Sequence, residues 1–535
     1  MRSDINARLL KYKSKDKKIF IQVDGLAYDI LERAIEKNYT PFLKKMLSKK
    51  GYKKYKIISN LPSNTPASQM KIMYGLKSKI KGFRWYNKKE NLHYSFKNPK
   101  TANYWENIAK KETKEELLKD GASYINIFTG GARRSLLTLS KMFETNKKMR
   151  IENNEIWKFI FLNADLVFKI SYFLVKETIL EFFESLSYKI KKKSQRHQPF
   201  FFYVRLTNNV FFKEIASLGA MLEMNEGVKK IYITYMGYDE LGHMRGPETK
   251  EALRTLKNID KSIKKVVKKA EQKGYEVYIF SDHGQTKSIP FQKKYGIKLK
   301  EVIKKSIAVD IGIKEYNAKY EHKEFMFFYG LEKILKTVIV LGYKPIEFII
   351  NKIFKYTKKH KKEKIDINED IVVTNSGPMS HIYIKNIPKR MEESEILEKF
   401  PNLLSNLKKH NGIEFLAVKS KKGYKIMGKN GEILLNEQYE IIYENKNVFK
   451  NMNMSKKEVL KSLAEVIIGE DIGDIILFGA MLEENLVINF EEQYGGHGGI
   501  GGLQNFPFLI TQNIIQKRGK TILDLYNIFR EKGDD

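Results

Sequence analysis

The run EVYIFSDHGQT, residues 276–286, decides the fold class of this chain. Its first five residues are mainly apolar, aromatic or β-branched, and Ser, Asp, His and Gly follow directly. This order is typical of a buried strand that delivers polar side chains to its carboxyl end. We therefore expect Asp282 and His283 to lie at the edge of a sheet, where they can bind a metal ion.

Two other segments repeat this arrangement. KKIFIQVDGL (17–26) ends a predicted strand at Asp24, and KKIYITYMGYDELGH (229–243) places Asp239 and His243 just after another. Residues four apart share one face of a helical turn, so Asp239 and His243 can bind the same ion. Three strands that each end in a carboxylate predict a site with more than one metal.

The rest of the chain alternates between strand and helix patterns. Helices are predicted over 27–48, interrupted by Pro41, and over 66–74, ending at Gly75. Strands are predicted over 18–23, 53–59, 123–128, 231–236, 277–281, 371–374 and 475–478. This alternation favours an α/β fold, with a mostly parallel sheet covered by helices on both faces. We expect one catalytic domain over residues 1–535.

Two insertions, approximately 145–200 and 320–366, interrupt this alternation. Within them, 157–190 is predicted to form a pair of amphipathic helices, and 325–356 has the same character and runs into KYTKKHKKEK (355–364). One interpretation is a helical subdomain packed on the core. The other is a cap that covers the substrate or contacts a membrane surface.

Composition limits the classes of function. The chain has no cysteine, which excludes disulfides, zinc fingers, iron–sulfur clusters and thiol nucleophiles. Its net charge of +35 favours anionic partners, namely a phosphorylated small molecule, a lipid-linked phosphate or an anionic membrane surface. An A+T-rich genome would also enrich lysine, and no specific nucleic-acid motif is present. Without an apolar signal or spanning segment, we expect a cytoplasmic protein, with peripheral attachment to a membrane as an extension.

Three of the nine histidines lie where metal chemistry needs them: His243, His283, and His497 in EEQYGGHGGIGG (491–502). With Asp24, Asp239 and Asp282 they make six ligands, which divide into two groups of three and leave open positions on each ion. Carboxylates and imidazoles without thiolates suit zinc, or manganese as the alternative. We therefore expect two divalent metal ions.

The nucleophile is expected to be Thr65 in the run SNTP (63–66). Thr65 is predicted as the N-cap and Pro66 as the first helical residue. The positive end of the helix would stabilise an anionic oxygen or a phosphate there. Ordinary helix capping alone could explain Thr before Pro, but the position of Thr65 between Asp24 and the later ligands favours catalysis.

In this order, the motifs resemble the alkaline phosphatase superfamily, and most closely its type I phosphodiesterase/nucleotide pyrophosphatase branch. IKGFRWYNK (80–88) and GGARRSLLTLS (130–140) also resemble a bacterial subgroup of alkaline-phosphatase-like proteins. The resemblance implies Thr65 as nucleophile and bridging metal ligand. It also implies the two ligand sets Asp239, His243, His497 and Asp24, Asp282, His283.

The chain departs from this branch at two points. An asparagine that usually follows the nucleophile by three residues is replaced by Ser68, with Gln69 next. The nucleophile loop has no arginine, which argues against a sulfatase and favours diesters over monoesters. Arg84, Arg133 and Arg134 remain candidates for a phosphate contact.

The expected activity is metal-dependent hydrolysis of a phosphodiester, pyrophosphate or phosphonate bond through a phospho-threonine intermediate. The first alternative is a phosphomonoesterase, phosphomutase or phosphotransferase of the same superfamily. The second is not an enzyme but a basic, amphipathic membrane-surface binding protein that uses its metal site for stability.

Overall fold

The computed structural model describes residues 16–77, 79–143, 164–190, 201–307, 311–317, 370–469, 471–483, 485–515 and 520–531. Its central sheet has seven strands in the order β2-β21-β8-β1-β7-β5-β6. The bounds are β1 (Lys18–Val23), β2 (Lys53–Lys56), β5 (Ala122–Tyr124), β6 (Arg134–Leu136), β7 (Lys230–Tyr235), β8 (Glu276–Phe280) and β21 (Phe508–Thr511). Strands β8, β1, β7, β5 and β6 are parallel, while β21 is antiparallel to both its neighbours. The predicted mostly parallel α/β fold is confirmed.

Both faces of this sheet are covered, as the apolar strands require. Every residue of β1 is buried. Ile19 and Ile21 pack into the core on one face, and Phe20 packs into the core on the other. Successive side chains of a strand point to opposite faces, so one short apolar run supplies two separate cores.

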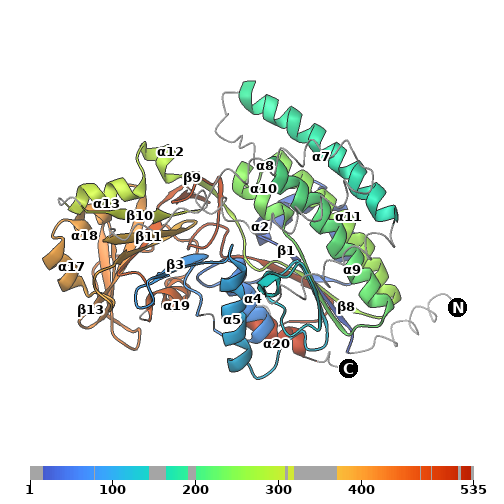
Figure 1. Ribbon diagram of the computed structural model, residues 1–535, viewed down its shortest axis with the longest axis horizontal. Coiled ribbons are helices and arrows are strands. Elements are labelled where there is room, and N and C mark those ends of the chain that lie inside the picture. The colour runs from blue at the N-terminus through green and yellow to red at the C-terminus, as the bar shows by residue number, and fades with distance from the viewer. Residues whose placement is uncertain are drawn as a thin grey trace.

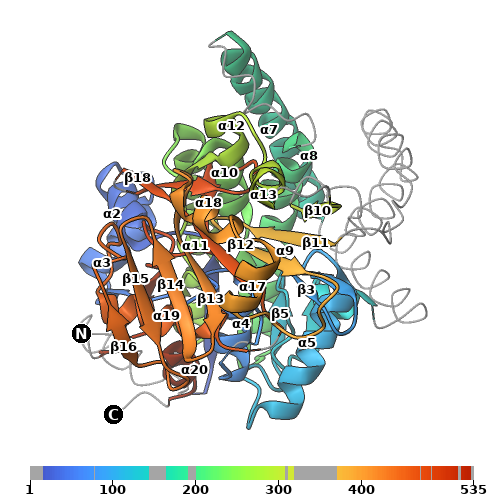
Figure 2. The ribbon, with the colours of Figure 1, turned by 90° about the vertical axis from the view of Figure 1, so that its left-hand side faces the viewer.

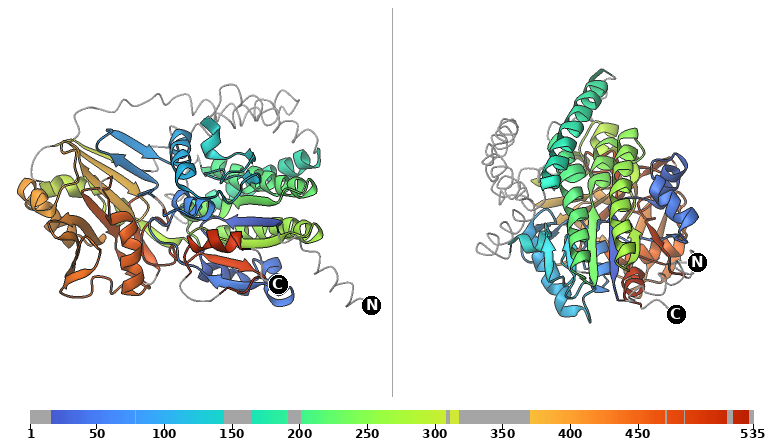
Figure 3. Two further views of the ribbon diagram at one scale, coloured as in Figure 1. Left: turned by 90° about the horizontal axis from the view of Figure 1, so that it is seen from below. Right: turned by 90° about the vertical axis from the view of Figure 1, so that its right-hand side faces the viewer.

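Helices form the outer layers (Figure 3). One face carries α2 (Tyr28–Glu36), α3 (Pro41–Lys49), α9 (Lys213–Asn225) and α11 (Lys250–Gln272). The other carries α4 (Thr65–Tyr74), α5 (Pro99–Glu112) and α20 (Asp524–Arg530). Pro41 separates α2 from α3, as predicted, because proline is tolerated in the first turn of a helix and disrupts its interior.

A second sheet of eight strands has the order β10-β11-β12-β17-β13-β14-β15-β16 (Figures 1 and 2). Its strands are β10 (Ile313–Tyr316), β11 (Ile371–Ser376), β12 (Met379–Ile384), β13 (Ile413–Ser420), β14 (Gly423–Gly428), β15 (Gly431–Leu435), β16 (Ile441–Glu444) and β17 (Ile475–Gly479). All pairs except β10–β11 are antiparallel. The predicted strands 371–374 and 475–478 therefore exist, but they belong to a sheet that the sequence pattern did not reveal.

Helices also cover this second sheet. The helices α13 (Leu299–Ile307), α17 (Glu393–Lys399) and α18 (Leu403–Lys409) pack on one core, and α19 (Lys456–Ile467) packs on the other. A short helix, α12 (Phe291–Tyr295), precedes α13.

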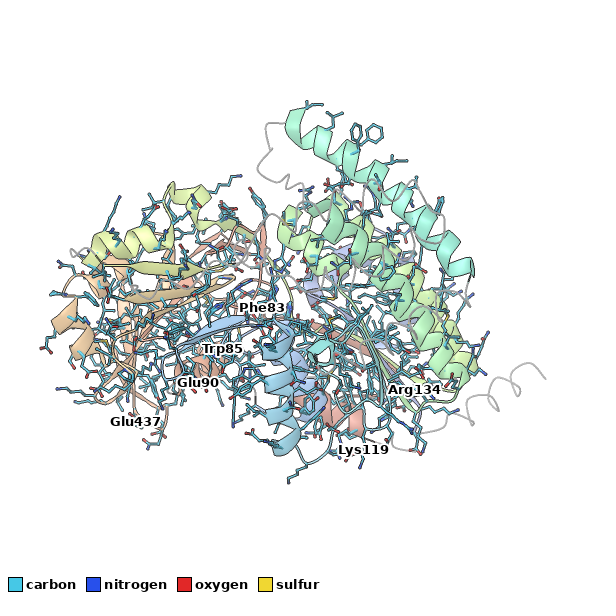
Figure 4. All side chains as sticks on the ribbon, in the orientation of Figure 1. Phe83, Trp85, Glu90, Lys119, Arg134 and Glu437 are labelled. Carbon is cyan, nitrogen blue, oxygen red and sulfur yellow. The ribbon has the colours of Figure 1, made fainter. Side chains whose placement is uncertain are left out.

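Two small sheets join these parts. β9 (Thr286–Pro290), β18 (Met481–Glu483), β19 (Leu486–Asn489) and β20 (Gly495–Gly496) form a sheet in the order β18-β19-β9-β20. The hairpin of β3 (Arg84–Asn87) and β4 (Leu92–Ser95) approaches β11, where the Arg84 backbone N–H donates to Ser376 Oγ at 3.1 Å. The Trp85 ring stacks on Tyr94 with centroids 5.1 Å apart, near the middle of the molecule (Figure 4).

The remaining described helices precede and follow β7. They are α7 (Ala164–Ile190), α8 (Phe201–Leu206), a π-helical turn (Thr207–Phe212), and α10 (Gly237–Arg245), with a 3₁₀ turn at Leu139–Phe143. The predicted helix pair is wrong over 164–190, which forms one continuous helix of 27 residues. Insertion 320–366, including segment 325–356, lies outside the described residues.

Candidate metal centre

The site lies at the carboxyl ends of three adjacent parallel strands. Asp24 follows β1, and Asp282 and His283 follow β8. Asp239 lies on α10, which begins two residues after β7. Because β8, β1 and β7 are neighbours with the same direction, their carboxyl ends meet at one edge of the sheet.

Thr65 reaches this edge from the N-terminus of α4. Its Oγ1 lies 3.2 Å from Asp24 Oδ1 and 3.2 Å from His283 Nε2. The prediction that Thr65 caps the helix is wrong: the N-cap is Asn64, whose side chain accepts a hydrogen bond from the Ala67 N–H at 3.1 Å. Asparagine is among the strongest N-cap residues, and its extended backbone leaves Thr65 as the first helical residue. The Thr65 hydroxyl is therefore directed at the acidic cluster instead of at the helix.

The first ligand cluster is Asp24, Asp282 and His283, and all three are buried. His283 Nε2 lies 3.5 Å from Asp24 Oδ1 and 3.4 Å from Asp282 Oδ2. Both oxygens of Asp282 are buried, and no group in the described part of the chain donates a hydrogen bond to either. A buried carboxylate in this state needs a cation, so the cluster fits a metal ion.

The second cluster is Asp239, His243 and His497. His243 Nε2 lies 3.0 Å from Asp239 Oδ2 and 3.0 Å from His497 Nε2. His497 Nε2 is 3.7 Å from Asp239 Oδ2. The nitrogen and oxygen atoms of three side chains, two from α10 and one from the distant His497 loop, thus point at one small volume.

The hydrogen bonds of the histidines assign their tautomers. The Nδ1 atoms of His243, His283 and His497 face the backbone carbonyls of Gly495, Gly284 and Ser63 at 2.8, 2.9 and 3.0 Å. A carbonyl can only accept, so each Nδ1 carries a proton and each Nε2 faces the cluster. This is the arrangement that orients histidines for metal binding.

The two clusters adjoin one another. The His283 and His497 rings stack with centroids 3.9 Å apart. Asp239, His283 and His497 also offer ligand atoms within 4.8 Å of one another, so His283 lies close to both groups. The structure thus gathers all seven predicted side chains: Asp24, Thr65, Asp239, His243, Asp282, His283 and His497.

Burial and crowding of charge shift the acids in opposite directions. Burial, followed by the charges of Asp282 and Asp239, raises the pKa of Asp24 well above its ordinary value. Burial would also raise the pKa of Asp239, but His243 and His497 hold it well below the ordinary value. The negative charge of the clustered carboxylates is therefore only partly balanced by positive groups of the protein.

The pKa values of the facing imidazoles, His243 and His497, shift in opposite directions. Burial lowers the pKa of His243, but Asp239 outweighs it and raises that pKa to about 9. Burial and the neighbouring His283 lower the pKa of His497 to about 4. One proton at His243 Nε2 thus relieves the repulsion of two lone pairs 3.0 Å apart. A divalent cation would displace this proton, because metal ligands bind in their deprotonated form.

Two supporting residues were not predicted. Gln285 Nε2 donates to the backbone oxygen of Asp239 at 3.1 Å and to its Oδ1 at 2.9 Å. The Ser63 hydroxyl donates to the Gly499 carbonyl at 3.0 Å, which connects the nucleophile loop to the His497 loop. Both residues stand inside the quoted motifs, but their partners are distant in sequence, so only the fold could reveal their roles.

Gly25 allows the backbone of the first motif to approach the site closely. It adopts φ of +68°, and a Cβ atom at this position would lie 2.1 Å from Asp239 Oδ1. Any other residue would displace the carboxylate.

Other candidates for a phosphate contact are occupied elsewhere. Gln69 donates to Gln22 and Asn126 at 3.1 Å each, within a buried amide network. Arg84 is buried against Glu491 at 2.7 Å, and Arg134 pairs with Glu223 at 2.8 Å. Because both arginines are paired with glutamates, their positions do not support the expectation that Arg84 or Arg134 contacts a phosphate. The third candidate, Arg133, has an exposed side chain.

The parallel sheet, with carboxylates, imidazoles and a hydroxyl at its carboxyl edge, is the arrangement expected for the alkaline phosphatase superfamily. The model of the type I phosphodiesterase / nucleotide pyrophosphatase family matches residues 18–445, and the chain belongs to this family. The resemblance stated from the motifs is thereby confirmed. The family is metal-dependent, which agrees with the ligand clusters described above.

Three solved structures align with 96% of this chain. Phosphonoacetate hydrolase from Sinorhizobium meliloti 1021, in complex with phosphonoacetate, is 11% identical, with 95% of its chain covered and a TM-score of 0.45. Inactive murine ectonucleotide pyrophosphatase / phosphodiesterase 5, in complex with AMP, is 11% identical, with 93% covered and a TM-score of 0.44. The human form gives 11%, 93% and 0.43. A search of curated proteins finds no match.

Proposed function

We propose that this protein is a two-metal hydrolase of phosphodiester, pyrophosphate or phosphonate bonds, with Thr65 as its nucleophile. The observation that carries the proposal is the position of Thr65 Oγ1, 3.2 Å from both Asp24 Oδ1 and His283 Nε2. A side-chain hydroxyl at a helix N-terminus, beside buried ligands, suits attack on phosphorus.

The residues around Thr65 have distinct tasks. Asp24 accepts the Thr65 hydrogen bond, which orients the hydroxyl and places a carboxylate where it can take the hydroxyl proton. The positive end of the α4 dipole lies beside the Thr65 hydroxyl and can stabilise an anionic phosphoryl oxygen there. In the proposed reaction, Thr65 Oγ1 bonds to phosphorus, the leaving group departs, and water then hydrolyses the phospho-threonine.

The candidate ligands are the two sets described above. Asp24, Asp282 and His283 would hold one ion, and Asp239, His243 and His497 the other. Two divalent cations would lower the pKa of an attached hydroxyl and neutralise charge on phosphoryl oxygens. The set of carboxylates and imidazoles suits zinc, with manganese as the alternative.

The proposed substrate is a phosphorylated small molecule or a lipid-linked phosphate with a diester, pyrophosphate or phosphonate bond. Support for a diester comes from the nucleophile loop, which contains no arginine. The cytoplasmic location and the single catalytic domain stay predictions from the sequence.

The test is hydrolysis of bis(p-nitrophenyl) phosphate by wild type, Thr65→Ala and Thr65→Ser. We expect Thr65→Ala to lower kcat/KM by at least about 10³-fold, roughly 4 kcal/mol of barrier. Thr65→Ser keeps a hydroxyl and should retain measurable turnover. Wild-type turnover by Thr65→Ala would contradict the assignment of the nucleophile.

The same assay defines the reaction class. Wild type should hydrolyse bis(p-nitrophenyl) phosphate faster than p-nitrophenyl phosphate, and a chelator should abolish both activities. Faster hydrolysis of the monoester would contradict the preference for diesters. A requirement for a second, acceptor substrate would indicate a transferase instead.

A further inference from the structure

The helix α7 exposes apolar side chains and buries acidic ones. Among the residues of α7 whose side chains the structure describes, every exposed one is large and apolar, between 44% and 73% exposed. They are Tyr172, Val175, Ile179, Phe182, Phe183, Leu186 and Ile190. Their spacing of three or four residues, apart from the adjacent pair Phe182–Phe183, places them in one stripe along the helix. We call this stripe the outer face of α7.

The opposite side of α7 is held by buried ion pairs. Arg205 donates to Glu177 at 2.9 Å and to Glu181 at 2.7 Å. Arg245 donates to Glu181 at 2.8 Å, and Arg254 to Glu184 at 2.6 Å. Turning the helix to bury its apolar side chains would break these pairs and leave buried charges without partners. The exposure of the outer face is therefore a fixed feature of the fold.

The location of α7 leaves this face accessible. The helix lies at the periphery of the molecule, along the outside of α8, α9 and α11 (Figures 1 and 3). Seven large apolar side chains on one exposed face exceed what a solvated surface ordinarily carries, and such a patch marks a binding site. None of the helices in the described part of the chain combines the length and hydropathy needed to span a bilayer.

Charge identifies the partner. In the sequence, Lys191, Lys192 and Lys193 follow the last residue of α7, and Arg196 comes soon after. Basic residues that follow an apolar helix in the sequence add attraction to anionic lipid headgroups, by about 1 kcal/mol per Lys or Arg near the membrane surface. A second copy of this chain fits less well, because two molecules with a net charge of +35 repel one another.

We propose that the outer face of α7 docks this protein on the surface of an anionic lipid bilayer. The helix lies in the plane of the membrane, with its apolar side chains among the headgroups and outer acyl chains. Arg245 belongs to α10, which also bears Asp239 and His243. The docked helix is thus tied directly to the element that carries two of the candidate metal ligands. The proposal does not depend on the reaction proposed above.

The first test is co-sedimentation of the full-length protein with vesicles. We expect binding to vesicles of phosphatidylcholine with about 30% phosphatidylglycerol, because the anionic headgroups attract the basic protein. Binding should weaken at about 0.5 M salt, where charges more than about 4 Å apart are screened. Replacing Ile179, Phe182 and Phe183 by Gln should weaken binding at least about tenfold, because three buried apolar side chains are lost.

A matched control removes three exposed large side chains elsewhere. Ile441, Ile442 and Tyr443 on β16 are 40%, 50% and 48% exposed. Replacing these three by Gln should leave vesicle binding unchanged. Equal loss in both triple variants, or no loss in the α7 variant, would overturn the proposal.

A second measurement does not depend on a triple variant. The chain has no cysteine, so Phe182→Cys can be labelled at one position with a polarity-sensitive fluorophore. Anionic vesicles should shift its emission to the blue and raise its intensity at least about twofold, whereas the same label at Ile442→Cys should not respond. No response at Phe182→Cys, or a concentration-dependent dimer that covers α7 in place of lipid, would overturn the proposal.

Discussion

At the scale of single residues, the site is defined by groups that the protein leaves incompletely paired. No group in the described part of the chain donates a hydrogen bond to the fully buried Asp282, and the Nε2 atoms of His243 and His497 face each other across 3.0 Å with one proton for both. Each arrangement is unfavourable in the protein alone and favourable around a cation. Arrangements that lower the stability of the folded protein are typical of functional sites, because binding or catalysis requires them.

The first prediction at this scale concerns Asp282→Asn. In chelator at pH 8, the variant should be more stable than wild type by about 1–3 kcal/mol, because a buried charge beside Asp24 is removed. Added Zn²⁺ should stabilise wild type and have little effect on the variant. Denaturant unfolding with and without metal measures both effects. A metal-free variant less stable than wild type would show that Asp282 has a structural role instead.

The second prediction concerns His381, which is buried in β12, away from the metal centre. Its Nε2 donates to the Lys81 carbonyl at 3.0 Å, and its Nδ1 accepts from the Gly473 N–H at 3.4 Å. The ring is therefore neutral, and burial lowers its pKa to about 4. The unfolded chain binds the proton near pH 6.5, so His381 makes stability fall as the pH falls from about 6.5 to about 4.

His381→Gln tests this effect, since Gln offers one donor and one acceptor without titrating. Over this pH range, wild type should lose up to roughly 3 kcal/mol more stability than the variant. The measurement is the free energy of unfolding at several pH values. Parallel pH profiles for the two proteins would contradict the assignment of a neutral buried imidazole.

At the scale of elements, ion pairs anchor α7 on the rest of the protein. Glu181 pairs with Arg205 and with Arg245, all three being buried. Glu181→Ala should lower the free energy of unfolding by about 3 kcal/mol, because buried arginine charge loses a partner. Glu112→Ala is the control: it removes an exposed pair with Lys79, which contributes less than about 1 kcal/mol. Equal effects in thermal or denaturant unfolding would contradict the buried anchor.

Elements could be predicted from the sequence where local pattern determines them. The apolar runs ending at Asp24 and Asp282 gave their strands within a residue, and Gly75 ended α4 as predicted, in a left-handed conformation. The N-cap was assigned to Thr65 in place of Asn64, since both residue types cap helices and the choice depends on what Thr65 contacts. Motif order, rather than composition, predicted the seven candidate residues that the structure brings together.

Long-range pairing explains what could not be predicted. The sequences of strands 371–374 and 475–478 do not indicate which sheet each strand joins. The partner of a strand depends on contacts between segments that are distant in sequence. The burial of Glu177 and Glu181 likewise depends on arginines of other helices. The predicted pair of amphipathic helices is one helix over 164–190, and the sequence alone did not predict which of its side chains face the core.

At the scale of the whole molecule, both large sheets contribute to the candidate metal centre at the carboxyl edge of the central sheet. The central sheet supplies Asp24, Asp239 and Asp282, while the small sheet of β9 and β20 brings the His497 loop to them. The second sheet approaches the same loop, since the Gly377 position lies against the His497 backbone. Convergence of distant segments on one volume is thus a property of the entire fold.

The most direct test of the account is anomalous X-ray diffraction from crystals grown with Zn²⁺. We expect two anomalous peaks per chain, each about 2.0–2.2 Å from nitrogen and oxygen ligands among the six proposed aspartate and histidine side chains. Thr65 Oγ1 should lie beside both peaks. No peak at this edge of the sheet, or peaks bound only by other residues, would contradict the central claim.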